Sequence, residues 1–271
     1  MKVILSRKGF DSSYGGMPSP IMPNGELLSI PIPSKNDSIC FTDISIGDQT
    51  LFQLIKQLKP KTKIKETYRL HLDPDLRSEW IPRSIEWKPV FGQQNQSLSH
   101  LENQGVGIGD IFLFFGWFRK SEEDQNGTLR FVPNAPDLHV VYGYLQIGQI
   151  FRNMNRLPES YLYHPHSKYS ISSNCIYEAA QNLSVDERFP GSGVFSYDKS
   201  LVLTKKGETR SKWDLPEAFK MLSISYHTKA SFSNGIFHSA KKGQEFVFED
   251  NQAVEQWALN IIKKGTSPNR C

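Results

Sequence analysis

Cysteine and long apolar stretches are both scarce in this chain of 271 residues. The three cysteines, Cys40, Cys175 and Cys271, are too few and too scattered for a disulfide framework. No CxxC pair occurs, which excludes a zinc finger built on cysteines. No apolar stretch approaches the length of a membrane span, and the opening MKVILSRKGF has too short an apolar run for a signal peptide. We therefore expect a soluble, cytoplasmic protein.

The chain also lacks a strong excess of either charge. It carries 32 Lys and Arg against 28 Asp and Glu, which gives a formal net charge of +4. This balance permits contact with phosphate, whereas a dedicated nucleic-acid binder would carry a denser basic stripe. The densest basic stretch, residues 56–65 (KQLKPKTKIK), is interpreted as a solvated helix end and loop.

Familiar catalytic signatures are missing as well. The sequence contains no GxSxG, no HExxH and no Walker loop, so these motifs do not predict a hydrolase, a zincin or a P-loop enzyme. The string GVGIG at residues 105–109 departs from the dinucleotide fingerprint in spacing and precedes a strand. The site must therefore be sought in less regular groups of polar residues.

Aromatic and β-branched segments predict an α+β fold with a mixed, largely antiparallel sheet. Aromatics make up 12% of the chain, enough for one large core. Glycines within the longest strands indicate that the central sheet is strongly curved, with helices at its periphery. We expect strands at 3–5, 26–33, 67–72, 109–119, 129–132, 138–151, 201–203 and 245–249. We expect helices at 48–58, 215–222 and 251–264, a short helix near residue 178, and a polar connection over 73–103.

No linker divides the chain, so we expect a single domain over residues 1–262 followed by a disordered tail over 263–271. In the last helix, Ala253, Trp257 and Ile261 are spaced as on a docking face. One interpretation of this helix is a contact with a partner protein encoded in the same operon.

The string His71-Leu72-Asp73-Pro74-Asp75 is a candidate metal site. In an extended chain, residues two apart point to the same side, so His71, Asp73 and Asp75 are predicted to face one way. One imidazole with two carboxylates suits iron, manganese or zinc. The alternative is a strand end with a capping carboxylate and a turn.

The string His164-Pro165-His166 repeats this geometry with two imidazoles. Two histidines and a carboxylate, with open coordination positions, form the known ligand set of non-haem iron oxygenases. We predict that His71 and His164 bind the same metal centre, because neither string alone supplies enough ligands. The alternative is two unrelated turns with solvated imidazoles.

Several charged residues are candidates for substrate binding or catalysis. Arg7 and Lys8 follow the first strand and suit a phosphate, and Asp11 lies in the same Gly-bearing loop. Arg119 needs an anion nearby, with Asp110 or Glu122 as a structural alternative. Glu245 is interpreted as a metal ligand, a base or a solvated side chain.

The segment over residues 109–151 resembles the strands of small β-barrels of the PUA and ASCH type. In that interpretation Trp117, Phe118 and Tyr144 form a stacking cage for an unstacked base. The protein would then be a reader of modified bases that performs no chemistry.

Five strings carry a wider resemblance: SRKGFDSSYGGMPSPI at 6–21, IPIP at 30–33, HLDPDL at 71–76, FGWFR at 115–119 and GQEF at 243–246. Over residues 2–248 the chain resembles the third nucleotide-modification-associated domain family of bacteria and phages. The resemblance implies an association with enzymes that modify bases in DNA or nucleotides. The positions that it carries over are Asp11, His71, Asp73, Asp75, Arg119, His164 and Glu245.

These observations together predict a metal-dependent enzyme that modifies a nucleotide or a nucleic-acid base. The metal ligands are predicted to be His71, Asp73, Asp75, His164 and His166, with Fe(II) favoured and zinc or manganese as alternatives. Iron would imply oxidation, and zinc or manganese would imply water activation for hydrolysis or deamination.

Overall fold

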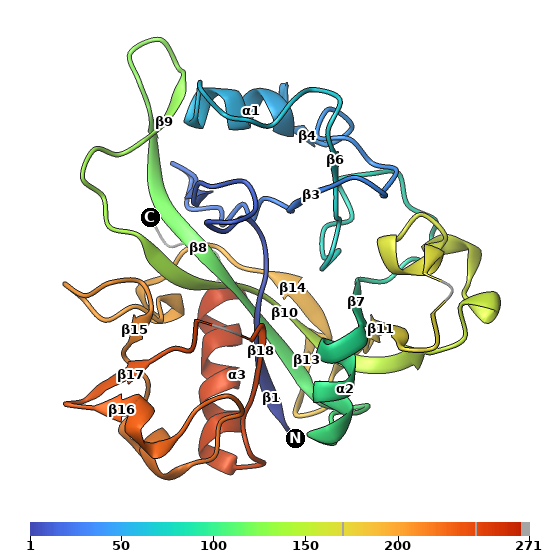
Figure 1. Cartoon of the computed structure of the whole chain (residues 1–271), viewed down its shortest axis with the longest axis vertical. Coiled ribbons are helices and arrows are strands. Elements are labelled where there is room, and N and C mark those ends of the chain that lie inside the picture. The colour runs from blue at the N-terminus through green and yellow to red at the C-terminus, as the bar shows by residue number, and fades with distance from the viewer. Residues whose placement is uncertain (170, 242, 267–271) are drawn as a thin grey trace.

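Two long antiparallel strands, β8 (Ile111–Glu123) and β10 (Leu138–Phe151), cross the molecule diagonally in the computed structural model (Figure 1). The structure describes residues 1–169, 171–241 and 243–266. Most residues of both strands are buried, because other elements cover both faces of the sheet. The register between the strands shifts at Val141 and Gly143, a β-bulge that increases the local twist.

The main sheet is mixed and curls into a half-barrel. Its strand order is β18 (Glu245–Val247), β1 (Val3–Arg7), β8, β10, β11 (Asn174–Ala179) and β7 (Val90–Gln94). Strand β14 (Ser192–Val194) also pairs with β10, and β2 (Ser19–Ile21) and β9 (Leu129–Phe131) pair with β8. Strands β1 and β2 run parallel to β8, and the other pairs are antiparallel. The predicted α+β class with a curved mixed sheet is confirmed.

Small sheets and short helices surround this half-barrel. Three small sheets have two strands each: β3 (Pro33–Ser34) with β6 (Arg69–Leu70), β4 (Ser45–Ile46) with β5 (Gln49–Thr50), and β12 (Asn182–Leu183) with β13 (Asp186–Pro190). A further small sheet has the strand order β15 (Lys212–Trp213), β17 (Ile236–His238) and β16 (Phe232–Ser233). The α-helices are α1 (Leu51–Leu58), α2 (Asn95–Asn103) and α3 (Gln252–Thr266). The 3-10 helices are Met154–Arg156, Glu159–Tyr161, Pro165–Lys168, Lys199–Leu201, Glu217–Met221 and Lys229–Ser231.

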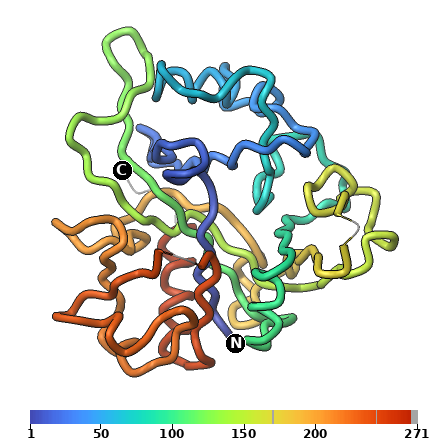
Figure 2. The backbone as a smooth tube through the Cα atoms, in the orientation of Figure 1, coloured from blue at the N-terminus to red at the C-terminus, as the bar shows by residue number. Residues whose placement is uncertain are grey.

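The core is divided between the two sides of the sheet. On one side α3 buries Val254, Ala258, Ile261 and Ile262 against the sheet. A second cluster forms around α1, which buries Leu51, Leu54, Ile55 and Leu58 as their spacing predicted. Figure 2 shows the two groups apart, with the blue and cyan segments that follow β1 at the top and the red C-terminal segments at the bottom, where the N-terminus also lies.

Several predicted elements differ from the structure. Residue 178 lies in β11, in the middle of the sheet, where tertiary pairing overrides the local preference for a helix. The connection predicted over 73–103 contains β7 and α2. No strand forms at the predicted 201–203, where Leu201 ends the 3-10 helix Lys199–Leu201 and Val202 makes only an isolated bridge with Val140. The helix predicted at 215–222 is only the 3-10 turn Glu217–Met221. Thr50, rather than Asp48, caps α1.

The C-terminal helix differs in its end and in its contacts. Helix α3 continues through residues 263–266, and the remaining residues of the predicted tail, 267–271, lie outside the described residues. Its buried face packs on the protein's own sheet, and Ala253 is exposed. None of the helices among the described residues is long and apolar enough to cross a membrane.

Candidate metal centre

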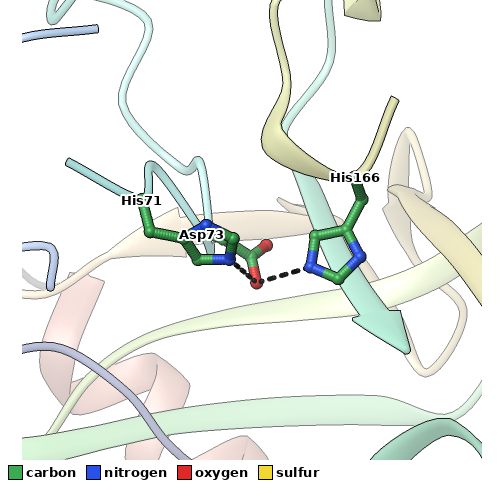
Figure 3. Close-up of side chains that lie close together, drawn as sticks. All are labelled: His71, Asp73 and His166. Carbon is green, nitrogen blue, oxygen red and sulfur yellow. Dashed lines mark ion pairs between the residues drawn. The ribbon is translucent and has the colours of Figure 1, made fainter. Parts of the chain in front are cut away.

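The carboxylate of Asp73 lies at the centre of three histidines. Nε2 of His71 and Nε2 of His166 lie 3.9 Å and 3.8 Å from its Oδ2 atom. Nε2 of His164 lies 3.4 Å from its Oδ1 atom. Figure 3 shows the His71 and His166 rings on either side of the Asp73 carboxylate. The structure therefore brings together the two histidine-containing strings.

Asp73 is buried and ionised. Its side chain is 5% exposed, and Oδ1 accepts a hydrogen bond of 2.7 Å from the backbone N–H of Gly92 in β7. Burial alone would raise the pKa of Asp73, but the polar contact with His164 and the nearby imidazoles hold it well below its usual value. The carboxylate therefore carries its negative charge within the cluster.

A second carboxylate sets the tautomer of His71. Its Nδ1 atom lies 2.9 Å from Oδ2 of Asp37. Burial alone would raise the pKa of Asp37, but the hydrogen bonds with His71 and Ser34 and the charges of His71 and Lys168 together lower it. An ionised carboxylate only accepts hydrogen bonds, so Nδ1 carries the proton and the Nε2 lone pair faces Asp73.

An amide fixes His166 in the same way. Nδ1 of His166 lies 2.8 Å from Oδ1 of Asn174, and Nδ2 of Asn174 donates to the backbone carbonyl of His166 at 2.8 Å. The second bond orients the amide, so its oxygen faces the ring and Nδ1 carries the proton. Burial lowers the pKa of His166 to about 4, against the opposing effect of Asp73. At neutral pH this imidazole is uncharged and its Nε2 lone pair is available.

His164 has the opposite tautomer. Its Nδ1 atom accepts the backbone N–H of His166 at 3.3 Å, so the ring proton lies on Nε2. Nε2 lies 3.4 Å from Oδ1 of Asp73 but outside hydrogen-bonding geometry, and the side chain is fully buried. The structure thus brings His71 and His164 to the same carboxylate but to different oxygens. His164 presents its protonated nitrogen to the carboxylate, whereas His71 and His166 present lone pairs.

Asp75 faces away from this cluster. Its Oδ1 atom accepts from the Arg83 guanidinium at 2.6 Å, and its Oδ2 atom accepts from the hydroxyl of Tyr163. Burial raises the pKa of Asp75, and the charge of Arg83 opposes this shift. Strand β6 ends at Leu70, so strand alternation does not extend to Asp75, which pairs with Val90 instead. The expected common orientation therefore holds for His71 and Asp73 and not for Asp75.

The cluster opens into a cavity of about 650 Å³, which we call the metal cavity. Six of the predicted site residues line it: Arg7, Lys8, Asp11, His71, Asp73 and His166. Its walls also contain Tyr14 from the first loop and Gln94, Asn95 and Gln96 at the start of α2. The first strand and its loop thus lie beside the histidine cluster.

The basic residues of this wall already have partners. The Arg7 guanidinium donates to the carbonyls of Ala240 at 2.7 Å and Lys241 at 3.3 Å, and burial lowers its pKa. Nζ of Lys8 lies 2.9 Å from Oε1 of Glu245, which is 1% exposed. The carboxylate predicted at Glu245 is therefore held in an ion pair behind the cavity wall.

Other predicted residues lie outside the metal cavity. Arg119 binds Asp137 at 2.6 Å, whereas Glu122 pairs with Arg130 and Asp110 accepts from the backbone N–H of Lys2. Phe118 and Tyr144 are fully buried in the core, so they offer no face to a base. Trp117 lines a neighbouring hollow. Asp11, by contrast, lines the metal cavity, and its Oδ1 atom accepts the N–H groups of Ser13 and Tyr14.

Sequence reasoning missed the residues that support the ligands. Asp37, Gly92 and Asn174 are isolated in the sequence, and each acts on a ligand from a different segment. Of these three residues, only Gly92 could have been found from the sequence. It lies inside the strand Val90–Gln94, and a glycine within a strand often marks a place where another group approaches the backbone closely.

The family model described as nucleotide modification associated domain 3 matches residues 2–249. The chain belongs to this family. No curated protein and no solved structure shows a significant match. The region matched by the family model contains the His71, Asp73 and His166 cluster and every residue of the metal-cavity wall.

Proposed function

We propose that this protein is a metal-dependent enzyme that modifies a base in a nucleotide or nucleic acid. A single divalent ion would be held by Nε2 of His71, Oδ2 of Asp73 and Nε2 of His166. The observation that carries this proposal is that two separate partners, Asp37 and Asn174, turn both imidazole lone pairs toward one carboxylate oxygen. Such partners are typical of histidines that bind metals.

The dimensions of the cluster fit an ion. The three ligand atoms lie within 4.8 Å of one another, and both Nε2 atoms are beyond hydrogen-bonding distance of Oδ2. An ion bonded at about 2.1 Å to each atom would require the ligands to close in by about 1 Å. The remaining coordination positions would face the metal cavity.

The ligand set favours Fe(II). Two imidazoles and one carboxylate with open positions are associated with non-haem iron oxygenases, which use the iron for oxidation with dioxygen. Zinc or manganese on the same three ligands would instead support hydrolysis or deamination by activating water. The identity of the bound metal therefore separates the two reaction classes.

The metal cavity suits a base. Its volume of about 650 Å³ is within the range of small-molecule sites. Gln94, Asn95 and Gln96 supply amides, which pair with the donors and acceptors of base edges. Tyr14 is 52% exposed and offers a ring face on which a base can stack.

The decisive experiment is elemental analysis of the anaerobically purified protein. We expect about one metal ion per chain in the wild type, and loss of that ion in His71→Ala, Asp73→Ala and His166→Ala. The control is His100→Ala, because His100 bonds Ser225 and does not line the metal cavity. A wild-type protein without metal, or ligand variants that retain it, would contradict the proposal.

The same measurement tests the reader hypothesis. A protein that only binds modified bases has no need for a stoichiometric ion. Of the three aromatic residues predicted for its cage, Trp117 alone lines a hollow, because Phe118 and Tyr144 are buried. The arrangement of side chains therefore favours the metal-dependent enzyme.

A further inference from the structure

A second hollow of about 320 Å³ adjoins the metal cavity, and we call it the tryptophan hollow. The two share the walls formed by Arg7, Lys8, Gly9, Asp11 and Lys241. On its other side the tryptophan hollow is lined by Trp117, His139, Arg210, Ser211 and Ser239. The two hollows are therefore neighbours beside the loop after β1.

Several polar atoms of these walls are buried without partners. Nε1 of Trp117, Oγ of Ser239 and Nε of Arg7 have no hydrogen-bond partner among the described residues. Trp117 and Arg7 contribute N–H donors, and a serine hydroxyl also donates. Buried polar groups in proteins are nearly always bonded, so three unpaired groups on residues that line one hollow indicate an absent acceptor.

Two further donors face the same hollow. Nδ1 of His139 accepts the indole N–H of Trp213 at 3.0 Å, and burial pushes the His139 pKa well below its usual value. The neutral ring therefore carries its proton on Nε2, which is a donor. The Arg210 guanidinium lies 4.1 Å from the Trp117 ring centre and donates to the hydroxyl of Ser12.

The charge of the tryptophan hollow is positive. Its walls contain the cations Arg7, Lys8, Arg210 and Lys241 and the anion Asp11. Lys8 is neutralised by Glu245, which leaves three cations against one carboxylate, a net charge of +2 (3 − 1). Oδ1 of Asp11 accepts two backbone N–H groups. An oxyanion without protons to donate would satisfy both the charge and the donors.

We propose that the tryptophan hollow binds a phosphate group of the substrate. This inference rests on the proposed function, since the base in the metal cavity would belong to the same nucleotide. Phosphate fits better than a planar carboxylate, because the donors come from separate elements: β1, β8, β10, the segment before β15 and the segment after β17. Both a free nucleotide and a nucleic-acid strand contain such a phosphate group, and the experiment below distinguishes these two sources.

The test measures phosphate binding to the metal-free protein by calorimetry in the presence of a chelator. The probes are inorganic phosphate, a 2′-deoxynucleoside 5′-monophosphate, the corresponding nucleoside, a short single-stranded oligonucleotide and acetate. We expect the monophosphate to bind at least tenfold more tightly than the nucleoside, and phosphate more tightly than acetate. A higher affinity for the oligonucleotide would assign the phosphate to a strand, and a higher affinity for the monophosphate would assign it to the free nucleotide.

Two variants remove single donors without changing charge. Trp117→Phe retains an aromatic ring beneath Arg210, and Ser239→Ala removes only the hydroxyl. Each should weaken phosphate binding by roughly tenfold, the effect of one hydrogen bond to a charged group. Arg130→Gln is the control, because Arg130 pairs with Glu122 away from the hollow.

The outcome is separable from that of the metal experiment. His166→Ala should lose metal and still bind phosphate, since His166 does not line the tryptophan hollow. Equal affinity of the nucleoside and its monophosphate would overturn the phosphate site even if the metal is present. Unchanged phosphate affinity in both folded donor variants would overturn it too.

Discussion

A β-carbon on Gly92 would lie 2.3 Å from Cγ and Cδ2 of His166, so the ring occupies the space that any side chain at residue 92 would need. The backbone N–H of Gly92 also donates to Oδ1 of Asp73 at 2.7 Å. One residue of β7 therefore positions two of the three proposed metal ligands, although it offers no ligand atom itself.

Gly92→Ala should displace His166 and weaken metal binding. We expect a loss of roughly tenfold to hundredfold in metal affinity, as for other residues that support ligands. Competition with a chelating dye measures this affinity. Gly107→Ala is the matched control, because no atom lies within 4 Å of a β-carbon added there. Wild-type affinity in Gly92→Ala would show that the ring position is not required.

The sequence predicted the long strands well because they are continuous runs of buried apolar residues. Strand β10 has its predicted limits, and β8 begins two residues and ends four residues later than predicted. Part of β11 was predicted as a helix, because local propensity does not reveal tertiary pairing. Its tyrosine, glutamate and alanine form a strand because β10 and β7 pair with it on either side. Strand β7 and α2 were missed because they are short and polar in part.

The candidate site was predictable where ligands lie close together in the chain. The spacing of His71 and Asp73 brought both to one cluster, and His166 meets them there. The orientation of Asp75 depended on Arg83, and that of His164 on a backbone N–H. Such long-range or main-chain partners leave no pattern in the sequence.

Asp37 is expected to support metal binding through His71. Asp37→Ala removes the carboxylate that holds the proton on Nδ1, so the ring can rotate or change tautomer. Metal affinity should fall by about tenfold or more, with stoichiometry retained at saturating metal. Asp124→Ala is the control, because Asp124 accepts backbone N–H groups in an exposed turn. Equal affinities in the two variants would exclude Asp37 from the site.

His164 should behave differently from the two proposed ligands. His164→Phe removes the N–H that faces Asp73 Oδ1, so the carboxylate is held less firmly. We expect one metal per chain to remain at saturation, with affinity reduced by about tenfold. His166→Ala, measured in parallel, should lose the ion. Complete loss of metal in a folded His164→Phe protein would instead identify His164 as a ligand.

Asp75 should contribute to stability and not to metal binding. Its carboxylate is fully buried against Arg83, and removing one partner leaves an uncompensated buried charge. Asp75→Asn should lower the free energy of unfolding by about 3–5 kcal/mol, measured in urea, with metal stoichiometry unchanged. The double variant Asp75→Leu with Arg83→Met should recover part of that loss. Loss of metal with unchanged stability would assign Asp75 to the metal centre.

His139 predicts a dependence of stability on pH. It is 6% exposed, and burial holds its pKa in the folded protein well below its usual value, whereas an unfolded chain gives about 6.5. Below pH 6.5 the unfolded state therefore binds a proton that the folded state does not, and the free energy of unfolding falls as the pH falls.

The effect of His139 is measured by comparing urea unfolding of the wild type and His139→Asn between pH 8 and pH 5. Asparagine retains an acceptor near the Trp213 indole N–H but does not ionise. Between pH 6 and pH 5 the wild-type free energy should fall more steeply than that of the variant, by up to about 1.4 kcal/mol per pH unit. Above pH 7 the two curves should run parallel, because the imidazole is then neutral in both states. Parallel curves over the whole range would mean that His139 gains its proton in the folded protein as readily as in the unfolded chain.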